Sequence, residues 1–257
     1  MTWKININSD LGAGYGRWRL GPDEELIPLV PTVSVACGFH AGDPRIMRRV
    51  AARAVDAGID VGAHVSLPDL RGFGHRPMEI DPEDLRDDVL YQVGALDAFV
   101  RAEGGAMRHV KPHGSLYAMC GRREEYARAL LTAISAYDDE LIVIAGQGWP
   151  QRLAEEYGLK VVCEGHIDLD YGPDGYPRVE PVKRSCDPDD VVRRALAIVK
   201  EQSAKALDGS VLEVVTPTLC LHGDMPNVVE VTHRVRERLA EEDIEIVGLT
   251  PALAAFA

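Results

Sequence analysis

The stretch TVSVACGFHAGDPRIMRRVAARAVDAGIDVGAH, residues 32–64, contains the complete repeating unit of this chain. An apolar run at 32–36 predicts a buried strand, and Asp43 followed by Pro44 predicts the N-cap and first position of a helix. A second apolar run at 59–63 predicts the next strand. A strand, a helix and a strand in this order form two parallel strands with the helix packed across them.

The same alternation continues along the chain. The expected strands are 4–8, 32–36, 59–63, 106–110, 141–145, 160–163, 218–221 and 244–247. The expected helices lie near 43–57, 81–103, 123–136, 148–157, 187–205 and 225–242. Repeated strand–helix units predict an α/β fold, and about eight strands in this length favour a TIM-like (β/α) barrel over an open sheet. No linker interrupts the pattern, so we expect one domain spanning residues 1–257.

The composition excludes several classes of function. With 28 Lys and Arg against 41 Asp and Glu, the formal net charge is −13, which argues against nucleic acid or an anionic membrane surface as a partner. No apolar run approaches the roughly 20 residues of a membrane span, and the first ten residues lack the apolar core of a secretion signal. The five cysteines are scattered and odd in number, which is typical of a cytoplasmic protein.

The segment DLGAGYG, residues 10–16, has two possible interpretations. Its three glycines resemble a phosphate-binding loop, but the spacing is not G-x-G-x-x-G and no helical pattern follows until about Asp23. A P-loop motif is also absent from the chain. The glycines are better explained as a tight backbone turn beside Asp10 that leaves room for a small ligand.

Polar residues follow most of the predicted strands, where a barrel forms its active site. Six of the eight histidines lie within a few residues of a strand end. The polar residues at these ends are Asn8, Asp10, His40, Asp43, His64, Asp69, Lys111, His113, Glu164, His166, Asp168, His222 and Asp224. The longest segment without a strand or helix pattern, 164–186, is of a length typical of a functional lid. The clustering predicts a catalytic pocket.

Several residues also have a simpler structural explanation. Asp43 is expected to cap a helix, and Asp224 either caps the helix after it or faces the pocket. His109 lies inside an apolar strand and is expected in the core, while His75 is expected on a loop. Cys37 has an apolar setting that favours a structural thiol over a nucleophile.

The remaining acids and imidazoles suit general acid–base catalysis, because imidazole titrates near neutral pH. The same groups could hold a divalent metal in a mixed carboxylate and imidazole shell. The H-E-x-x-H spacing is absent, so the sequence leaves a metal undecided.

Long motifs of this chain resemble the LamB/YcsF family. They are NINSDLGAGYG (6–16), SVACGFHAGDPRIMRR (34–49), GAHVSLPDLRGFGHRPM (62–78), YQVGALDAF (91–99), HVKPHGSLY (109–117) and LCLHGDMPN (219–227). The resemblance implies a TIM-like barrel of the glycoside hydrolase/deacetylase type. It also implies the A-subunit of an ATP-dependent 5-oxoprolinase, which opens the lactam 5-oxo-L-proline to L-glutamate with partner subunits B and C. The absence of a nucleotide motif agrees with ATP being bound together with those partners.

The resemblance also implies roles for individual residues. Asp10 and His64 are expected to position or activate water, His113 to act as acid or base at the lactam nitrogen, and Lys111 to stabilise negative charge. The expected substrate-binding residues are Asn8, His40, Gly42, Asp69, His222 and Asp224.

Three positions depart from the usual family motifs. Ala13 replaces an acid, and Val65 and Leu67 replace a proline and a tyrosine. These departures keep two alternatives open: a paralogue that hydrolyses another lactam or cyclic amide, with or without a metal, and a subunit that has lost its chemistry. Keeping Asp10, His64 and His113 together argues against the second alternative.

Overall fold

A curled parallel sheet forms the centre of the computed structural model, which describes residues 3–180 and 182–256. Its strands are β1 (Trp3–Leu11), β4 (Thr32–Ala36), β5 (Asp60–Val65), β6 (Met107–Pro112), β7 (Ile142–Ile144), β8 (Lys160–Val162), β9 (Gly165–His166), β12 (Thr218–His222) and β13 (Ile244–Ile246). Their order is β8-β7-β6-β5-β4-β1-β12-β9, with β13 beside β1. Only Cys163 and Glu164 separate β8 from β9, so the two ends of the curled sheet lie in one continuous segment of chain. The predicted TIM-like (β/α) fold is confirmed.

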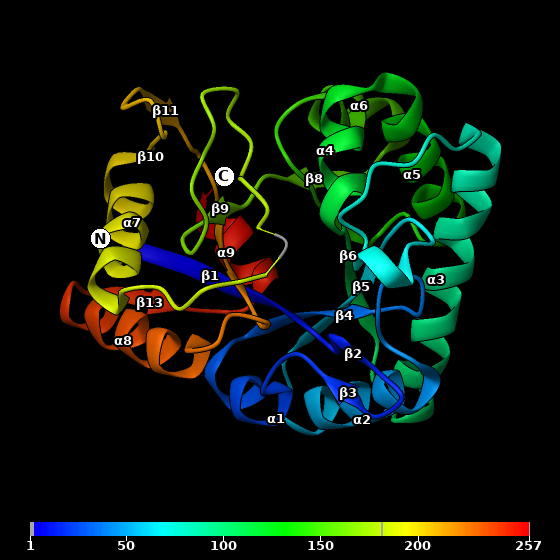
Figure 1. Ribbon diagram of the computed structural model, residues 1–257, viewed down its shortest axis with the longest axis horizontal. Coiled ribbons are helices and arrows are strands. Elements are labelled where there is room, and N and C mark those ends of the chain that lie inside the picture. Colours follow the sequence, from blue (N-terminus) through cyan, green and yellow to red (C-terminus); the bar gives the residue numbers. More distant parts are fainter. Residues whose placement is uncertain (1–2, 181, 257) are drawn as a thin grey trace.

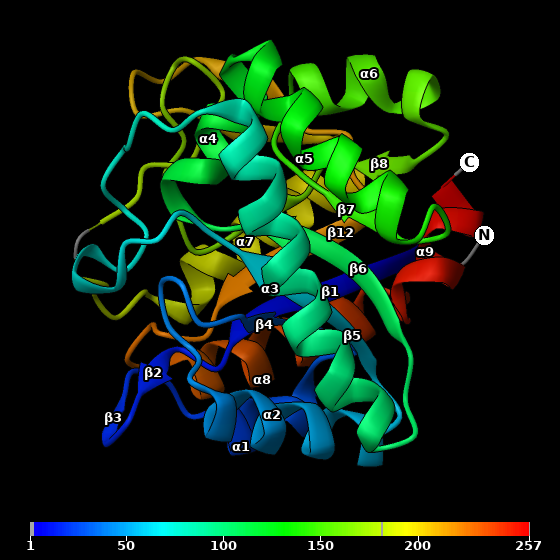
Figure 2. The same ribbon diagram turned by 90° about the vertical axis from the view of Figure 1, so that its right-hand side faces the viewer.

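Helices surround this sheet (Figures 1 and 2). They are α1 (Asp23–Leu26), α2 (Pro44–Asp56), α3 (Pro82–Ala102), α4 (Gly114–Arg122), α5 (Glu124–Tyr137), α6 (Trp149–Tyr157), α7 (Pro188–Glu201), α8 (Val228–Glu241) and α9 (Leu249–Phe256). The predicted helix starts are confirmed, because the side chains of Asp43, Asp81 and Asp187 accept backbone N–H groups at the start of α2, α3 and α7. The predicted domain limits, 1 and 257, lie outside the described residues.

The long helix α3 shows why apolar spacing predicted the helices well. Leu85, Val89, Val93, Leu96 and Val100 recur three or four residues apart, and each is at most 1% exposed. Burying each side chain stabilises the fold by about 1.5–3 kcal/mol relative to leaving it exposed. The stripe fixes the side of α3 that packs on the sheet.

One predicted helix has a wrong boundary, and helix α4 was not predicted. The helix expected over 187–205 ends at Glu201, because Gln202 adopts a left-handed conformation with φ 51°. The chain then forms β10 (Ser203–Lys205), which pairs antiparallel with β11 (Val211–Glu213). The helix expected at 123–136 is confirmed as α5, but the short helix α4 before it was not predicted. Helix α4 begins at Gly114 and contains Gly121, and glycine is unfavourable within helices, so its sequence offers no helical signal.

The glycines after Asp10 form a hairpin, β2 (Gly14–Tyr15) with β3 (Trp18–Arg19). A side chain at Gly14 would come within 2.5 Å of the Trp18 carbonyl oxygen, so the two strands approach too closely for any other residue. The predicted tight turn is confirmed.

Candidate active site

A cavity opens at the carboxyl ends of the strands, as the sequence predicts. Asp10, His64, Lys111 and His222 each occupy one of the last two positions of a strand. The parallel register places Asp10 beside His222 and His64 beside Lys111, although each pair is far apart in sequence. The strand ends therefore bring an acid, an ammonium and two imidazoles to one opening.

Seven of the ten predicted site residues line this cavity. They are Asp10, His40, His64, Lys111, His113, His222 and Asp224. The other three predicted residues, Asn8, Gly42 and Asp69, do not line the cavity and instead support the surrounding structure. Asn8 supports Lys111, a side chain on Gly42 would collide with Ala36, and the buried Asp69 carboxylate accepts from Gly72 and pairs with Arg76. Substrate contact by these three residues stays a prediction without support from the lining.

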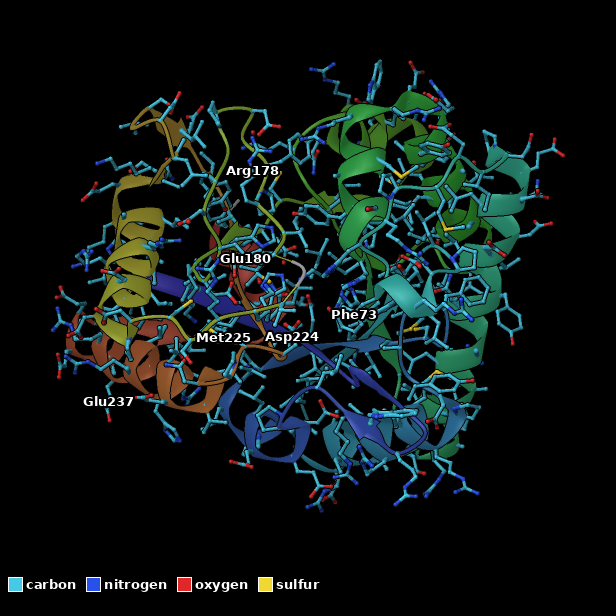
Figure 3. The ribbon with its side chains drawn as sticks, in the orientation of Figure 1. Phe73, Arg178, Glu180, Asp224, Met225 and Glu237 are labelled. Atoms are coloured by element: carbon cyan, nitrogen blue, oxygen red, sulfur yellow. The ribbon has the colours of Figure 1, made fainter. Side chains whose placement is uncertain are left out.

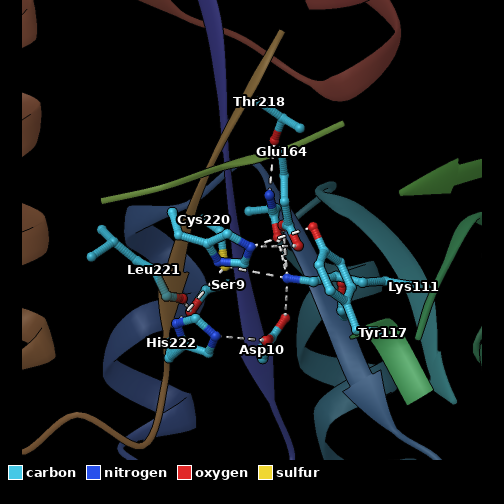
Figure 4. Close-up of polar contacts among 12 residues, drawn as sticks. Ser9, Asp10, Lys111, Tyr117, Glu164, Thr218, Cys220, Leu221 and His222 are labelled. Carbon is cyan, nitrogen blue, oxygen red and sulfur yellow. Dashed lines mark hydrogen bonds and ion pairs between the residues drawn. The ribbon is translucent and has the colours of Figure 1, made fainter. Parts of the chain in front are cut away.

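The Lys111 ammonium lies in the cavity floor within reach of four groups (Figure 4). Its Nζ donates to Asp10 Oδ1 at 2.9 Å and to Asn8 Oδ1 at 3.1 Å. It also lies 2.8 Å from Glu164 Oε2 and 3.2 Å from Cys220 Sγ. Burial lowers the pKa of Lys111, but the facing carboxylates outweigh burial and raise that pKa well above its usual value. An ammonium has three N–H groups, so none remains for a ligand.

The Asp10 carboxylate lies between two imidazoles. Its Oδ2 is 3.3 Å from His64 Nε2 and 3.8 Å from His222 Nε2. Burial raises the pKa of Asp10, but His64 and Lys111 outweigh it and hold the pKa well below its usual range. Asp10 is therefore ionised at neutral pH.

His64 and His113 share a proton, and their contacts establish this. His64 Nδ1 lies 3.0 Å from the Lys111 carbonyl oxygen, and His113 Nε2 lies 2.7 Å from the Phe73 carbonyl oxygen. A carbonyl oxygen only accepts, so both of these ring nitrogens carry hydrogen. The two remaining nitrogens, His64 Nε2 and His113 Nδ1, lie 3.0 Å apart, and a hydrogen bond between them requires a third proton. The pair is therefore cationic, with Asp10 as its counter-ion.

His64 lies between His113 and the Asp10 carboxylate. Its Nε2 is 3.0 Å from His113 Nδ1 and 3.3 Å from Asp10 Oδ2. Burial, followed by the charges of His40 and His64, lowers the pKa of His113 well below its usual value. The position of Asp10 therefore favours the positive charge on the His64 side of the pair.

His222 is held by a second carboxylate. Asp168 accepts from the backbone N–H of His222 at 2.9 Å and lies 3.0 Å from its Nδ1. Burial raises the pKa of Asp168, but His222 and Lys183 outweigh it and lower the pKa. An ionised Asp168 fixes a hydrogen of His222 on Nδ1, so that Nε2 is the ring nitrogen that faces Asp10 and the cavity.

Glu164 and His166 also line the cavity, together with Tyr117. His166 Nε2 lies 3.3 Å from the Tyr117 hydroxyl and 3.7 Å from Glu164 Oε1. Burial lowers the pKa of His166 to about 4. The sequence placed Glu164 and His166 at a strand end without assigning them a role. Tyr117 was not predicted, because it lies on α4, which the sequence did not indicate.

The structural explanations given to other residues are mostly confirmed. His109 is fully buried and lies 2.9 Å from the Ser34 hydroxyl. Burial raises the pKa of the Cys37 thiol to about 12, which makes it a poor nucleophile. Asp224 lines the cavity and does not cap α8, whose N-cap position is Asn227. Of the departures, Ala13 lines the cavity, whereas Val65 and Leu67 are buried in the core.

Two groups among the described residues bring metal-binding side chains together. In the first, His40, His64 and His113, the rings of His40 and His113 stack in parallel at 3.9 Å, so one ion cannot lie in both ring planes as they are arranged. In the second, His166, Cys220 and His222, the ligand atoms also lie within 4.8 Å of one another. Whether a metal binds stays undecided, as it is from the sequence.

A parallel β/α barrel with ionised acid, imidazole and ammonium groups at its carboxyl edge is typical of barrel enzymes. The sequence pattern of the LamB/YcsF family matches residues 5–254, and this chain belongs to the LamB/YcsF family. It is 42% identical over 249 residues to the 5-oxoprolinase A-subunit of Pyrococcus abyssi, and the match covers 96% of this chain and 98% of that protein.

Solved structures agree with this assignment. The lactam utilization protein of Thermus thermophilus superposes with a TM-score of 0.86 at 41% identity, over 96% of this chain and all of that one. A putative cellobiose-phosphate cleavage protein of Enterococcus faecalis, with a TM-score of 0.55 at 12% identity over 98% of this chain and 99% of that one, shares the fold alone. Across the described ranges 3–180 and 182–256, the helices are too short or too polar to span a bilayer.

Proposed function

We propose that this chain is the A-subunit of an ATP-dependent 5-oxoprolinase, a cyclic amide hydrolase that opens 5-oxo-L-proline to L-glutamate together with subunits B and C. The name of the Pyrococcus relative and the lactam utilization protein support the reaction class. The observation on which the mechanism rests is the position of Asp10 Oδ2 between His64 Nε2 and His222 Nε2. We further propose a cytoplasmic location, in keeping with the five free cysteines.

The two imidazoles have opposite proton requirements. His222, whose Nδ1 is held by Asp168, offers a free Nε2 and acts as the general base that takes a proton from water. The His64–His113 pair holds the additional proton, and His64 delivers it to the lactam nitrogen as the C–N bond breaks. Asp10 orients the water between them.

These assignments modify two roles that the sequence indicated. Both ring nitrogens of His113 are engaged, so His113 relays a proton to and from His64 instead of meeting the substrate directly. The Lys111 ammonium has no free N–H, so it acts by holding Asp10 and Glu164 in place.

ATP enters through the partner subunits in this proposal. A five-membered lactam resists hydrolysis, and transfer of the γ-phosphoryl group from ATP to the amide oxygen, with release of ADP, makes its carbonyl carbon electrophilic. Addition of water and cleavage of the C–N bond then give an acyl phosphate, and a second water releases phosphate and L-glutamate. No nucleotide-binding motif is present in this sequence, so the phosphoryl transfer is assigned to surfaces of B and C.

The test uses this chain assembled with subunits B and C. His222→Asn removes the proposed base, and we expect kcat for ATP-coupled 5-oxoproline turnover to fall by about 10²–10⁴-fold. His233→Asn, an exposed histidine on α8, is the matched control and should leave turnover unchanged. A His222→Asn enzyme that keeps half of the wild-type kcat would overturn the assignment.

One observation favours a second candidate, a paralogue that acts on another cyclic amide. Ala13 lines the cavity at a position where the family motif has an acid, so the wall near the ligand differs. Turnover of a panel of five- and six-membered lactams and cyclic imides, with and without chelator treatment, separates the two candidates. Preference for another lactam, or loss of activity that an added divalent metal restores, would favour the paralogue.

A further inference from the structure

Two lysines line the cavity, and only one of them is paired. Lys183 lies on the rim segment, which we define as residues 167–180 and 182–187 between β9 and α7. Figure 3 shows Arg178 and Glu180 of this segment on the side of the molecule where Phe73 and Asp224 lie. The Lys183 Nζ is shielded from solvent and has no hydrogen-bond partner among the residues that the structure describes. A buried ammonium without an acceptor is costly, and such an atom indicates a missing partner.

The acids near Lys183 do not provide that partner. Asp168 lies close enough for the Lys183 charge to help lower its pKa, but its two oxygens face the backbone N–H and Nδ1 of His222. Asp224 lines the cavity but forms no ion pair with Lys183 in the described chain. The missing acceptor is therefore expected from a ligand.

The charge of the floor points to the same conclusion. Lys111 is already paired with Asp10 and Glu164 there, and it has no spare N–H to receive a third anionic group. A ligand with a negative group therefore finds no free cation at the floor, whereas the Lys183 ammonium is available at the rim. The apolar side chains Phe73, Leu169 and Val179 also line the cavity and suit a small ring.

We propose that Lys183 binds the carboxylate of a lactam carboxylic acid and thereby selects the substrate. This inference rests on the proposed function, since 5-oxo-L-proline carries a carboxylate on the carbon next to its ring nitrogen. Pairing at the rim leaves the amide end of the ring directed at Asp10 and His222. Lys183 is then a specificity-determining residue, and lactams without a carboxylate lack this contact.

The experiment compares Lys183→Met, Lys183→Arg and Arg184→Met in the enzyme assembled with subunits B and C. Arg184 is a suitable control because it is the next residue, also cationic, and its side chain is 85% exposed. We expect Lys183→Met to raise KM for 5-oxoproline about tenfold or more with a smaller change in kcat. Lys183→Arg should recover part of the loss, and Arg184→Met should match wild type. The proposal would be overturned if Arg184→Met raised KM as much as Lys183→Met does, or if Lys183→Met lowered kcat without changing KM.

A binding measurement on the chain alone separates this proposal from the reaction. Chemical-shift titrations use 5-oxo-L-proline and 2-pyrrolidinone, which is the same lactam without the carboxylate. Lys183→Met should weaken the binding of 5-oxo-L-proline and leave the binding of 2-pyrrolidinone unchanged. Equal binding of 5-oxo-L-proline by wild type and Lys183→Met would refute the carboxylate site even if turnover is confirmed. Inorganic phosphate is the third probe: if Lys183→Met loses phosphate binding alone, the anion is a phosphoryl group and the carboxylate assignment is wrong. If wild-type enzyme opens no 5-oxoproline but binds it through Lys183, the proposed function fails and the site remains.

Discussion

The floor and the rim of the cavity each contain a lysine, and the two lysines differ in almost every physical respect. Lys111 is 2% exposed and lies on the central strand β6. Its ammonium contacts four partners: Asn8, Asp10, Glu164 and Cys220. Lys183 lies on a long connection and has no acceptor in the described residues. The floor is thus complete without a ligand, whereas the rim is not. This difference separates the groups that organise the site from the group that is expected to recognise a substrate.

The largest effect is expected from breaking the floor. Lys111→Met leaves the Asp10 and Glu164 carboxylates buried without their cation, and we expect the free energy of unfolding to fall by about 3–5 kcal/mol. Urea unfolding measures the loss. Adding Asp10→Asn and Glu164→Gln to the same protein removes both unpaired charges and should restore much of the stability without restoring turnover. A single variant as stable as wild type would show that the floor does not depend on this ion pair.

An intermediate effect is expected from acid, through His109 below the floor. Burial lowers the pKa of His109 to about 3, whereas an unfolded histidine titrates near 6.5. Because the folded value is the lower one, the stabilising effect is complete above pH 6.5 and is lost as pH falls toward 3. Between pH 6.5 and pH 5 we expect this residue to account for about 2 kcal/mol of lost stability.

His109→Gln should flatten that part of the pH dependence. Urea unfolding at pH 6.5 and pH 5 measures it, with His233→Gln on the exposed face of α8 as the control. Identical slopes for wild type and His109→Gln would mean that the buried ring is protonated in the folded protein.

The smallest effect on stability is expected at the rim. Lys183→Met removes an ammonium that has no hydrogen-bond partner among the residues 3–180 and 182–256, so the free energy of unfolding should change by less than about 0.5 kcal/mol or rise slightly. The same variant is expected to lose substrate affinity. Substitution of Lys111 therefore mainly lowers stability, whereas substitution of Lys183 mainly lowers substrate binding. Destabilisation of Lys183→Met by more than about 2 kcal/mol would show that the rim lysine is a structural group like Lys111.

The strands and helix starts of this fold could be read from the sequence with few errors. All eight expected strands exist, because buried parallel strands are short apolar runs, and Asp43, Asp81 and Asp187 mark helix starts by local chemistry. Errors occurred where an element gives no local signal. Strand β9 has only two residues, helix α4 begins at Gly114 and contains Gly121, and β10 follows a left-handed turn at Gln202 that no apolar pattern indicates.

The candidate site was predictable only as a set of residues. Asp10, His64, His113 and His222 were found because barrel sites form at strand ends, and the structure places them on one cavity. Asp69 was included on the same ground, but its carboxylate is buried against Arg76. Tyr117 and Lys183 were missed because one lies on the unpredicted helix α4 and the other on a segment without a pattern.

The sequence by itself determined the alternation of strands and helices, the starts of three helices and the presence of acid, imidazole and ammonium groups at strand ends. These features depend on residues near one another in the chain. Only the tertiary structure decided which groups each imidazole contacts, that Lys111 has a partner for each N–H and that Lys183 has no hydrogen-bond partner among the described residues. Those properties depend on distances between groups about 100 residues apart, such as Asp10 and Lys111, and hydrogen bonds and burial act through those distances.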